Sequence, residues 1–461
     1  MKHLRELILI FFFLAVIQSI YSQIWPKYYF AGNNSGPWSV IESYDKGFII
    51  SGTYYYSTGV PKFGYILKTD INGNILWFKH FGSLNYKTSI YSAKQTTDGG
   101  YIFTGSKSSV DPSGDVFFAK TDPCLNLEWC KQYNSNYNQF DWGREVYEIS
   151  GGYVALVEQF GTDIFNKRIW LFKMNENGDL IWEQSYAQKD SLINNEESYS
   201  FIVTYDQHYV ITGDCYYPDS GSISPVHLRP YIIKVDSSGN SEWELPWSSI
   251  SGVSFKGQSF QSIVDNNKKM YSSGRHIESS AIPPGDLPTM IETDSSGNEI
   301  AWHDIINNTW QAIGSTIDWF NDSTIAIGGG WIFTPGDTVH NGVFKIARNG
   351  TLLQMKHMFV NDYTFSDAIT TSDNKLMLVA ALYTNIWNTY AWKLNSNLEY
   401  DTIYSQPFVY DSLCPYPITS DTIPLDCEIV GLDEPLQNPE TGRLKVFPNP
   451  AFNQLHIEIP D

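Results

Sequence analysis

The sequence predicts an all-β fold, a seven-bladed β-propeller of four-stranded blades, and three observations carry this prediction. A phrase first met at Lys68–Trp77, KTDINGNILW, recurs along the chain. Each copy is flanked by short runs of β-branched and aromatic residues broken by Gly, Asn and Asp, a pattern typical of strands and tight turns. The copies are 51 to 60 residues apart, the period of four-stranded blades around a channel. The repeats begin near Trp38, Ser89, Trp142, Ser198, Gln258, Gln311 and Thr364. A long β-solenoid is the alternative, although solenoid repeats are usually shorter.

The first 22 residues have the layout of a secretory signal peptide. Lys2 and Arg5 give a basic start, an apolar run covers 7–17, and Ser22 precedes the expected cleavage point. Eleven apolar residues are too few to span a bilayer, so a retained anchor is the weaker alternative. We therefore expect passage through the Sec translocon and a mature chain without a transmembrane anchor, secreted or on the outer cell surface.

The charge of the chain excludes one class of partner. The formal net charge is −20, whereas nucleic-acid binding requires clustered Lys and Arg against phosphates. An acidic surface favours solubility, and we expect a monomer that binds no nucleic acid.

Each repeat divides into four short runs, the pattern of one blade. In the second repeat the runs lie at 89–96, 101–106, 115–122 and 127–133. Tight turns with Asp and Gly separate the first run from the second and the third from the fourth. We expect the propeller to occupy residues 23–410.

The N-terminus supplies a device for closing the ring. WPKYYFAG at 25–32 precedes the first repeat but matches WFKHFG at 77–82, the fourth run of a blade. A lone outer strand can complete the last blade and cover its open edge. The last repeat's own fourth run, around 401–407, is weak and lacks the Trp. We expect 25–32 to pair with the seventh blade near 390–394.

The repeated phrase itself has a structural explanation. Gly73 supplies positive φ in a tight turn, and the Asp70 carboxylate can cap backbone N–H groups there. The Trp that follows is large enough to fill the wedge between blades. The predicted docking residues are Asp70, Gly73, Trp77, Trp129, Trp182, Trp243 and Trp302. Gln354 and Thr402 replace the Trp in the last two repeats.

This phrase resembles the tryptophan-docking repeat of quinoprotein-type propellers and, more loosely, the Asp-box of sialidases. In both families an Asp, a Gly and an aromatic residue mark the turn between the third and fourth strands. The spacing here, Asp70-x-x-Gly73-x-x-x-Trp77, is one residue shorter than the usual quinoprotein form. The resemblance covers the repeat region and implies a fold and a scaffold role. It implies no activity.

The cysteines predict one disulfide. Cys414 and Cys427 flank a Pro-rich segment within 411–442, which we take as a linker. In an oxidising compartment a bridge between them is expected, contributing about 3 kcal/mol by the loop-entropy model. Cys124, Cys130 and Cys215 remain unassigned.

The C-terminal residues 443–461 depart from the repeat. They resemble the start of the type A sorting domain of Bacteroidetes proteins exported by the type IX secretion machinery, which would be a partner in transit. The matching residues are Phe447, Pro448, Asn449, Pro450, Ala451, Leu455 and Ile457. That family's tail is a complete β-sandwich, whereas this chain covers its first strand or two. We therefore expect an incomplete sorting domain and, with Asp461 as the end, transport that stalls in the periplasm.

No motif for catalysis, metal or cofactor binding is present. The His residues are scattered, no Cys or His spacing indicates zinc, and no G-x-S-x-G elbow occurs. The D-x-N-G turn lacks the bidentate Glu of a calcium loop. A sialidase would need three convergent arginines, and a quinoprotein dehydrogenase a cofactor cage. We expect no metal and no cofactor, although a glycosidase-like carboxylate pair stays open.

Aromatic side chains mark the most plausible binding face. The second-to-third and fourth-to-first connections of blades emerge on one face, and loops commonly carry function. Aromatics near these loops are Tyr54, Tyr55, Tyr56, Tyr216, Tyr217, Trp331, Phe333 and Trp387. They suit a carbohydrate or protein ligand, or merely pack loops against blades. We expect a non-catalytic binding or cell-surface module; the alternative is a secreted polysaccharide hydrolase using loop carboxylates.

Overall fold

The computed structural model covers most of the repeat region. It describes residues 25–30, 33–55, 62–108, 114–134, 140–160, 167–186, 194–218, 226–247, 249–250, 253–278, 285–361, 365–405, 408–431, 445–447 and 456–458. The expected signal peptide 1–22 lies outside the described residues. So do Tyr56 and the motif residues Pro448, Asn449, Pro450, Ala451 and Leu455.

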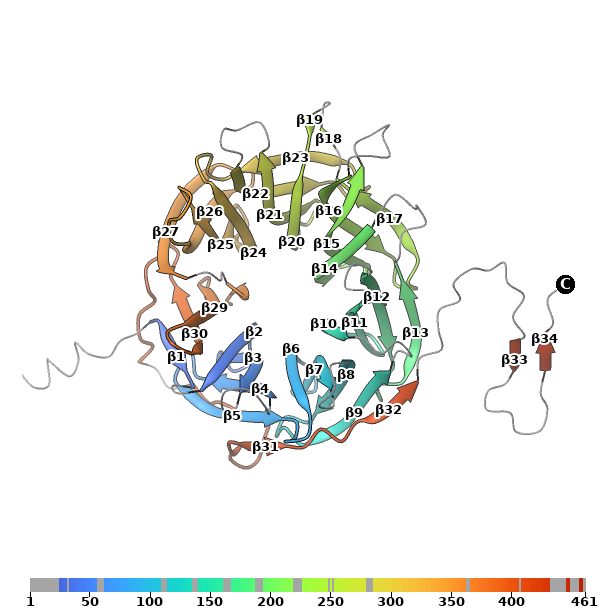
Figure 1. Cartoon of the computed structure of the whole chain (residues 1–461). Coiled ribbons are helices and arrows are strands. Elements are labelled where there is room, and N and C mark those ends of the chain that lie inside the picture. The colour runs from blue at the N-terminus through green and yellow to red at the C-terminus, as the bar shows by residue number, and fades with distance from the viewer. Residues whose placement is uncertain are drawn as a thin grey trace, which may run out of the picture.

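The sheets stand side by side around a central axis, which makes the protein a β-propeller with four-stranded blades (Figure 1). Five sheets are separate and four-stranded, and each is an antiparallel meander apart from the one that closes the ring. Their strands are β10 (Asp141–Ile149), β11 (Gly152–Phe160), β12 (Lys167–Met174), β13 (Leu180–Ser185); β14 (Asn194–Val203), β15 (Tyr209–Pro218), β16 (Val226–Val235), β17 (Ser241–Pro246); β20 (Gly257–Val264), β21 (Met270–Glu278), β22 (Gly285–Thr293), β23 (Glu299–Asp304); β24 (Gln311–Asn321), β25 (Thr324–Ile332), β26 (His340–Ala347), β27 (Leu352–Val360); and β28 (Asp367–Thr370), β29 (Leu376–Tyr383), β30 (Trp387–Leu394) with β1 (Lys27–Tyr29).

The first two repeats share one ten-stranded sheet. Its strands are β2 (Asn34–Glu42), β3 (Phe48–Tyr55), β4 (Lys62–Thr69), β5 (Ile75–Phe81), β6 (Lys87–Gln95), β7 (Tyr101–Ser108), β8 (Gly114–Thr121), β9 (Leu127–Asn134), β31 (Asp421–Ile423) and β32 (Glu428–Gly431). A single parallel pair, Lys62 with Lys87, joins β4 to β6. The sequence predicted seven separate four-stranded blades, whereas the structure has five separate four-stranded sheets, because this bridge merges the strands of two repeats into one sheet.

The N-terminal strand closes the ring as the sequence predicted. Strand β1 pairs antiparallel with β30, placing Lys27 opposite Ala391 and Tyr28 opposite Tyr390. It forms the outer edge of the sheet whose other strands come from the end of the repeat region. Trp25 and Tyr29 are buried in the same cluster as Tyr65 and Ala391, so the two ends of the repeat region share a core.

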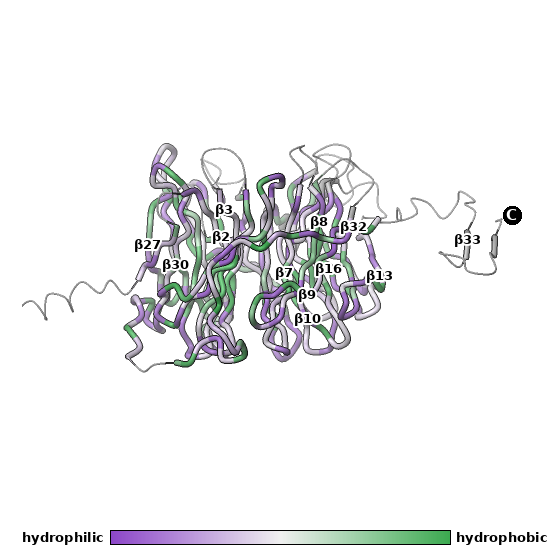
Figure 2. The backbone as a smooth tube through the Cα atoms, turned by 90° about the horizontal axis from the view of Figure 1, so that it is seen from below, coloured by the Kyte–Doolittle hydropathy of each residue, from purple (hydrophilic) through white to green (hydrophobic). Residues whose placement is uncertain are grey.

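The segment 408–431 lies along the outside of the ring, and we call it the tail strap (Figure 2). Strand β31 pairs parallel with β5, and β32 pairs parallel with β9. Disulfides join Cys414 to Cys124 and Cys427 to Cys130. The predicted Cys414–Cys427 disulfide is wrong, because the segment between these cysteines extends along two outer strands instead of folding back on itself.

The core lies between neighbouring sheets. One buried cluster combines Ile66 and Trp77 with Tyr101 and Phe103 of the next repeat, and each further interface has its own cluster.

Two short hairpins stand apart from these sheets, β18 (Ser249–Ile250) with β19 (Val253–Ser254), and β33 (Lys445–Phe447) with β34 (His456–Glu458). The expected C-terminal β-sandwich is therefore present, within the described residues, only as a two-stranded hairpin. None of the described segments forms a helix long and apolar enough to cross a membrane.

The repeated turn is built around its carboxylate. Asp70 Oδ1 accepts hydrogen bonds from the backbone N–H groups of Asn72 at 2.9 Å and Asn74 at 2.7 Å. Gly73 has φ 76°, and a Cβ there would lie 2.7 Å from the Trp25 ring. A larger residue at this position would therefore clash as well as strain the turn.

The same contact recurs around the ring, with an outer-strand Trp lying against the turn glycine of the following repeat. The pairs are Trp25–Gly73, Trp129–Gly178, Trp182–Gly239 and Trp243–Gly297. Trp77 packs in one cluster with Leu125, which holds positive φ in place of Gly. The Trp side chains therefore dock one repeat onto the next.

Trp302 departs from the expected docking role. Its ring packs against Phe255 and His276 on the other side of its sheet, at centroid distances of 5.3 and 5.6 Å. His303 instead faces Gly350 of the following turn. The extra residue before Trp302 moves it one position along β23, and successive side chains of a strand point to opposite faces.

Candidate functional site

The predicted aromatics do not gather at one place. Tyr55 and Trp387 share a pocket of about 330 Å³ with Trp38 and Ala381. This pocket lies where the first repeat meets the last, because Tyr55 ends β3 and Trp387 begins β30. Its lining is mainly apolar, so it can accept the apolar face of a ligand.

The other predicted aromatics lie elsewhere. Tyr54 is buried against Phe30 and His80, so it belongs to the interface core. Trp331 is 2% exposed and packs on Phe344, although its edge lines a separate pocket of about 220 Å³. The remaining three aromatics are the exposed Tyr216, the exposed Phe333 and the half-buried Tyr217.

A second cavity, of about 180 Å³, lies on the ring axis. The innermost strand of every sheet, or the residue just before it, contributes to the lining. The lining residues are Trp38, Ser39, Tyr91, Arg144, Glu145, Tyr199, Phe260, Gln261, Ser315, Ser366 and Asp367. We call this the axial cavity. Trp38 and Ser366 also line the 330 Å³ pocket, so the two spaces share a wall.

β-Bulges place the side chains that line the axial cavity. The register of β2 against β3 shifts between Pro37 and Ser39, which leaves Trp38 as the extra residue. The same irregularity occurs at Tyr91, Arg144 and Tyr199. A bulge leaves one residue unpaired and redirects its side chain. The other bulged residues are Phe260, Gln261 and Ser315.

Aromatic contacts line one side of the axial cavity. Trp38 meets Tyr91 edge-on at 5.1 Å between ring centroids, and Tyr91 lies 5.9 Å from Trp142. Tyr199 and Phe260 are 5.1 Å apart. Three serines, Ser39, Ser315 and Ser366, also line the cavity. Its lining therefore combines polar side chains with four aromatic ones, Trp38, Tyr91, Tyr199 and Phe260, which we call the aromatic wall.

Arg144 provides the positive charge at the aromatic wall. Its Nε donates to Glu158 Oε2 at 2.8 Å, and its guanidinium lies 4.9 Å from the Trp142 ring. Burial alone would lower the pKa of Arg144, but the Glu158 carboxylate raises it above its ordinary value. Arg144 therefore stays charged and is held in place by Glu158.

Tyr199 is also held in place, because its hydroxyl donates to Asp214 Oδ2 at 2.9 Å.

Three carboxyl groups lie around the axis with raised pKa values. Burial raises the pKa of Glu145 to about 7, with Lys94 opposing and Asp367 adding to the rise. Burial likewise raises the pKa of Asp318 to about 6 and that of Asp367 above its ordinary range. Glu145 and Asp318 therefore titrate close to neutral pH, as an acid or base would.

The same carboxyl groups also join neighbouring repeats. Asp367 Oδ2 accepts a hydrogen bond from the Val40 N–H at 3.0 Å, and Glu145 Oε2 accepts one from the Phe201 N–H at 3.2 Å. Each bond crosses from one innermost strand to the next. These contacts give the carboxyl groups a structural role that requires no catalysis.

The site holds no evident metal centre. Among the described residues, no three His, Cys, Asp or Glu side chains are placed to hold an ion. The lining of the axial cavity offers stacking on Trp38 and Tyr91, and hydrogen bonding to Arg144, Glu145 and Gln261.

The sequence did not point to the residues that line the axial cavity, because most of them are extra residues in β-bulges and so interrupt the alternating pattern of their strands. First-strand segments such as PWSV and SIYSA place an aromatic residue at the same point of the repeat, at Trp38 and Tyr91. Comparing first strands alone would have shown this shared position. The remaining repeats carry Arg144, Tyr199 and Phe260 there, and this variety hides the shared geometry.

Comparisons with known proteins assign no family to the chain. No protein-family model matches the chain, and no curated protein matches it either. Among solved structures, it is similar to a protein of unknown function from Bacteroides caccae, with 12% identity, coverage of 60% of this chain and 84% of that one, and a TM-score of 0.36. A GH93 α-L-arabinofuranosidase of Fusarium graminearum has 12% identity, coverage of 67% and 95%, and a TM-score of 0.42. Chaetomium thermophilum Sqt1 has 11% identity, coverage of 83% and 87%, and a TM-score of 0.46. At these identities and scores the likeness is one of fold alone, and the chain is an all-β propeller.

Proposed function

We propose that this protein is an exported, non-catalytic binding propeller whose ligand is a saccharide held at the axial cavity and the pocket beside it. The observation that carries the proposal is the bulged aromatic wall, Trp38, Tyr91, Tyr199 and Phe260, which faces the ring axis. Bulges that redirect side chains are commonly placed next to functional sites.

The dimensions and chemistry of the two spaces suit this ligand. The axial cavity of about 180 Å³ is small, but the adjoining pocket of about 330 Å³ shares Trp38 with it. Together they fall within the range of about 300–1,000 Å³ usual for ligand sites. A sugar ring has an apolar face that stacks on Trp38 and hydroxyls that bond to Arg144 and Gln261.

A glycan array tests this proposal. The mature protein should retain a defined set of saccharides, and Trp38→Ala should weaken binding at least tenfold, as for a central aromatic contact. Phe333→Ala serves as the matched control because it removes an exposed aromatic that lines neither space. Equal binding by the Trp38→Ala variant, or an array with no saccharide retained, would contradict the proposal.

A secreted polysaccharide hydrolase is the second candidate, and one observation favours it. Glu145 and Asp367 line the same cavity, and each has a raised pKa. A glycosidase pair, however, needs two carboxyl groups whose pKa values are driven apart, whereas here both pKa values are raised. The inter-repeat hydrogen bonds of both groups support binding as the main role.

A panel of polysaccharide substrates separates the two candidates. If the protein is a hydrolase, turnover should fall at least a hundredfold in Glu145→Gln, the loss typical of a removed general acid or base. If it is a binding module, neither the wild type nor Glu145→Gln releases reducing sugar, while glycan retention persists in both.

We also propose that the protein is exported in two steps, through the Sec translocon and then the type IX secretion machinery to the cell surface or medium. The layout of residues 1–22 and the resemblance of 443–461 to a sorting domain support this route. The test is fractionation of a Bacteroidetes host that expresses the chain followed by a complete sorting sandwich. Replacing Pro448, Asn449 and Pro450 by Ala should leave the protein in the periplasm, and unchanged surface display would contradict the route.

The finer fold assignment is part of the same proposal. We count β2–β5 and β6–β9 as two units, which makes a seven-unit ring. Two observations support this count: each set is its own antiparallel meander, and one residue pair joins them. Replacing Lys87 by Pro, which removes its N–H, should leave the circular dichroism and melting temperature nearly unchanged, whereas a large loss would favour a single fused sheet.

A further inference from the structure

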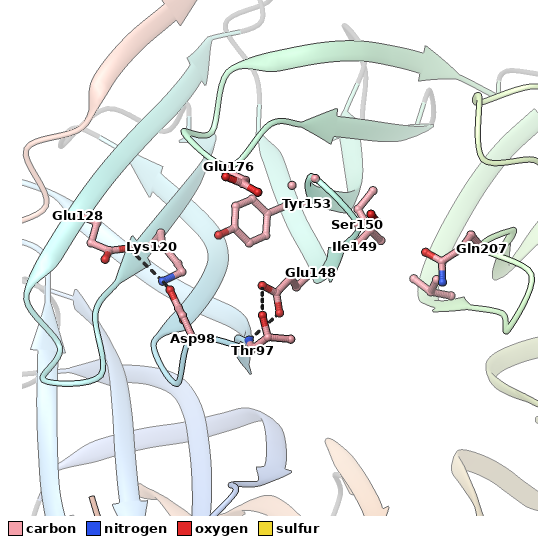
Figure 3. Close-up of a pocket in the computed structure, with 13 residues that line it drawn as sticks. Thr97, Asp98, Lys120, Glu128, Glu148, Ile149, Ser150, Tyr153, Glu176 and Gln207 are labelled. Atoms are coloured by element: carbon pink, nitrogen blue, oxygen red, sulfur yellow. Dashed lines mark hydrogen bonds and ion pairs between the residues drawn. The ribbon is translucent and has the colours of Figure 1, made fainter. Parts of the chain in front are cut away.

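A third and larger pocket, of about 750 Å³, lies among the strand-connecting turns of the second, third and fourth repeats (Figure 3). Its floor includes Gly151 and Gly152 in the turn between β10 and β11. Four acidic side chains and one lysine line it, giving an excess of three negative charges. They are Asp98, Glu128, Glu148, Glu176 and Lys120. The pocket shares no lining residue with the axial cavity.

An ion pair between a buried lysine and an Asp at the wall of this pocket recurs in two other repeats. Lys120 Nζ lies 2.7 Å from Asp98 Oδ2. The equivalent pairs are Lys68 with Asp45 at 2.8 Å and Lys393 with Asp373 at 3.2 Å. In each case the Asp side chain also accepts a bond from a hydroxyl two residues before it, so the three turns have the same construction.

In the two other repeats, the chain itself supplies a further donor to the Asp. The Asp411 backbone N–H donates to Asp45 Oδ2 at 2.9 Å. The Tyr404 hydroxyl donates to Asp373 Oδ2 at 2.6 Å. Within the described part of the chain, Asp98 Oδ2 accepts only from Lys120. Its side chain is 54% exposed, against 1% for Asp45, so this acceptor faces the open pocket.

Tyr153 adds a second polar group aimed into the pocket. The residue is 5% exposed, and its ring packs on Trp129 at 5.7 Å. Figure 3 shows the ring below Glu176, with its hydroxyl directed toward the side where Lys120 and Glu128 lie. Within the described residues the hydroxyl has no hydrogen-bond partner. Burial, and then the surrounding carboxylates, raise the pKa of Tyr153 above its ordinary value, so the hydroxyl stays protonated.

We propose that this pocket binds an extended peptide segment that carries a lysine or arginine side chain. A backbone N–H of the peptide donates to Asp98 Oδ2, as the Asp411 N–H does to Asp45 in the first repeat. The ammonium or guanidinium group enters the acidic lining near Glu176, and the Tyr153 hydroxyl bonds to a peptide carbonyl. The tail strap thus gives an internal example of a backbone N–H bound to this kind of Asp. In the second repeat the strap lies against Gly99, but none of its residues lines the pocket.

Blocked peptides and two variants test the proposal, and two further variants serve as controls. The probes are acetyl-Gly-Arg-Gly-amide, its citrulline counterpart without charge, and spermine as a cation with no peptide groups. Calorimetry at low salt should detect the arginine peptide. Tyr153→Phe should weaken its binding about five- to tenfold, since one neutral hydrogen bond is lost. Glu176→Gln should weaken it about two- to fivefold and reduce the salt dependence.

Matched controls separate this site from other effects. Tyr209→Phe changes the equivalent tyrosine of the next repeat, which lines none of the pockets described here, and should leave peptide binding unchanged. Trp38→Ala should also leave it unchanged, so failure of saccharide binding would not affect this test. Equal affinity of wild type and Tyr153→Phe would overturn the proposal. Spermine or the citrulline peptide binding as tightly as the arginine peptide would also overturn it.

Discussion

Replacing Glu145 by Gln should change the pH dependence of stability in a defined way. Burial raises the pKa of this carboxyl from its ordinary value near 4.5 to about 7. Between these pH values the unfolded chain has released a proton that the folded chain still holds. The stability contributed by the protonated carboxyl is therefore fully present below about pH 4.5 and is lost as the pH rises through 7. The neutral amide of Gln should remove this loss.

The size of the effect follows from the shift and from the exposure of the group. At about 1.4 kcal/mol per pKa unit, the full shift corresponds to about 3 kcal/mol. The Glu145 side chain is partly open to the axial cavity, where water screens its charge, so we expect about 1–2 kcal/mol. Glu145→Gln should thus be more stable than wild type by about 1–2 kcal/mol at pH 8 and equal to it at pH 4.5.

Urea unfolding followed by tryptophan fluorescence, at several pH values between 4.5 and 8.5, measures this difference. Glu399→Gln is the control, since Glu399 is exposed on a turn and lines none of the pockets described here. A Glu145→Gln variant that is destabilised equally at pH 4.5 and pH 8 would refute the reasoning. It would show that the carboxylate is ionised and needed for its bond to the Phe201 N–H.

Three further predictions concern the scaffold. Trp77→Ala should destabilise the protein by about 3–5 kcal/mol, because this ring is 2% exposed. Trp182→Ala should lower the stability by about half as much, because Trp182 is only partly buried. Equal midpoints of urea unfolding for the two variants would contradict this ranking. Mass mapping without reduction should recover Cys124 linked to Cys414 and Cys130 linked to Cys427, while a peptide joining Cys414 to Cys427 would contradict the structure. Deleting residues 25–30 should expose the edge of β30 and produce aggregation by light scattering, whereas a monomeric product with the wild-type melting temperature would show that β1 is dispensable.

Much of the fold could be read from the sequence because the repeat fixes local structure strongly. Asp70, Gly73 and the following Trp specify a turn in which the Asp70 carboxylate accepts from backbone N–H groups two and four residues later, so short spacings were enough to find it. The N-terminal match to a fourth strand gave the pairing of β1 with β30 for the same reason.

Long-range contacts were not readable in this way. The cysteines of each disulfide are 290 and 297 residues apart, and no local pattern marks Cys124 or Cys130 as the partner of a tail cysteine. The link between Lys62 and Lys87 depends on one backbone pair, which leaves no mark in composition. One inserted residue was also enough to turn Trp302 to the other face of its strand.

The candidate site was harder to predict because no single segment contains it. The axial cavity takes side chains from the innermost strand of every repeat, and only ring closure brings Trp38 and Asp367 together. The loop aromatics were a reasonable choice by composition. However, Tyr54 and Trp331 proved to be core residues, since an aromatic at a strand end can face either the loop or the next sheet.

The pairing of β1 with β30 sets an order of events for a chain that emerges from its N-terminus. The backbone of Lys27 has no strand partner until Ala391 has appeared, and the cysteines of the tail strap arrive later still. Throughout this interval an unpaired strand is available to other chains, which is the situation that favours aggregation. The earlier repeats can pair their own strands during this interval, but the ring can close only after residue 391 has appeared. We therefore expect a product interrupted before residue 391 to remain an open, aggregation-prone arc instead of a smaller ring.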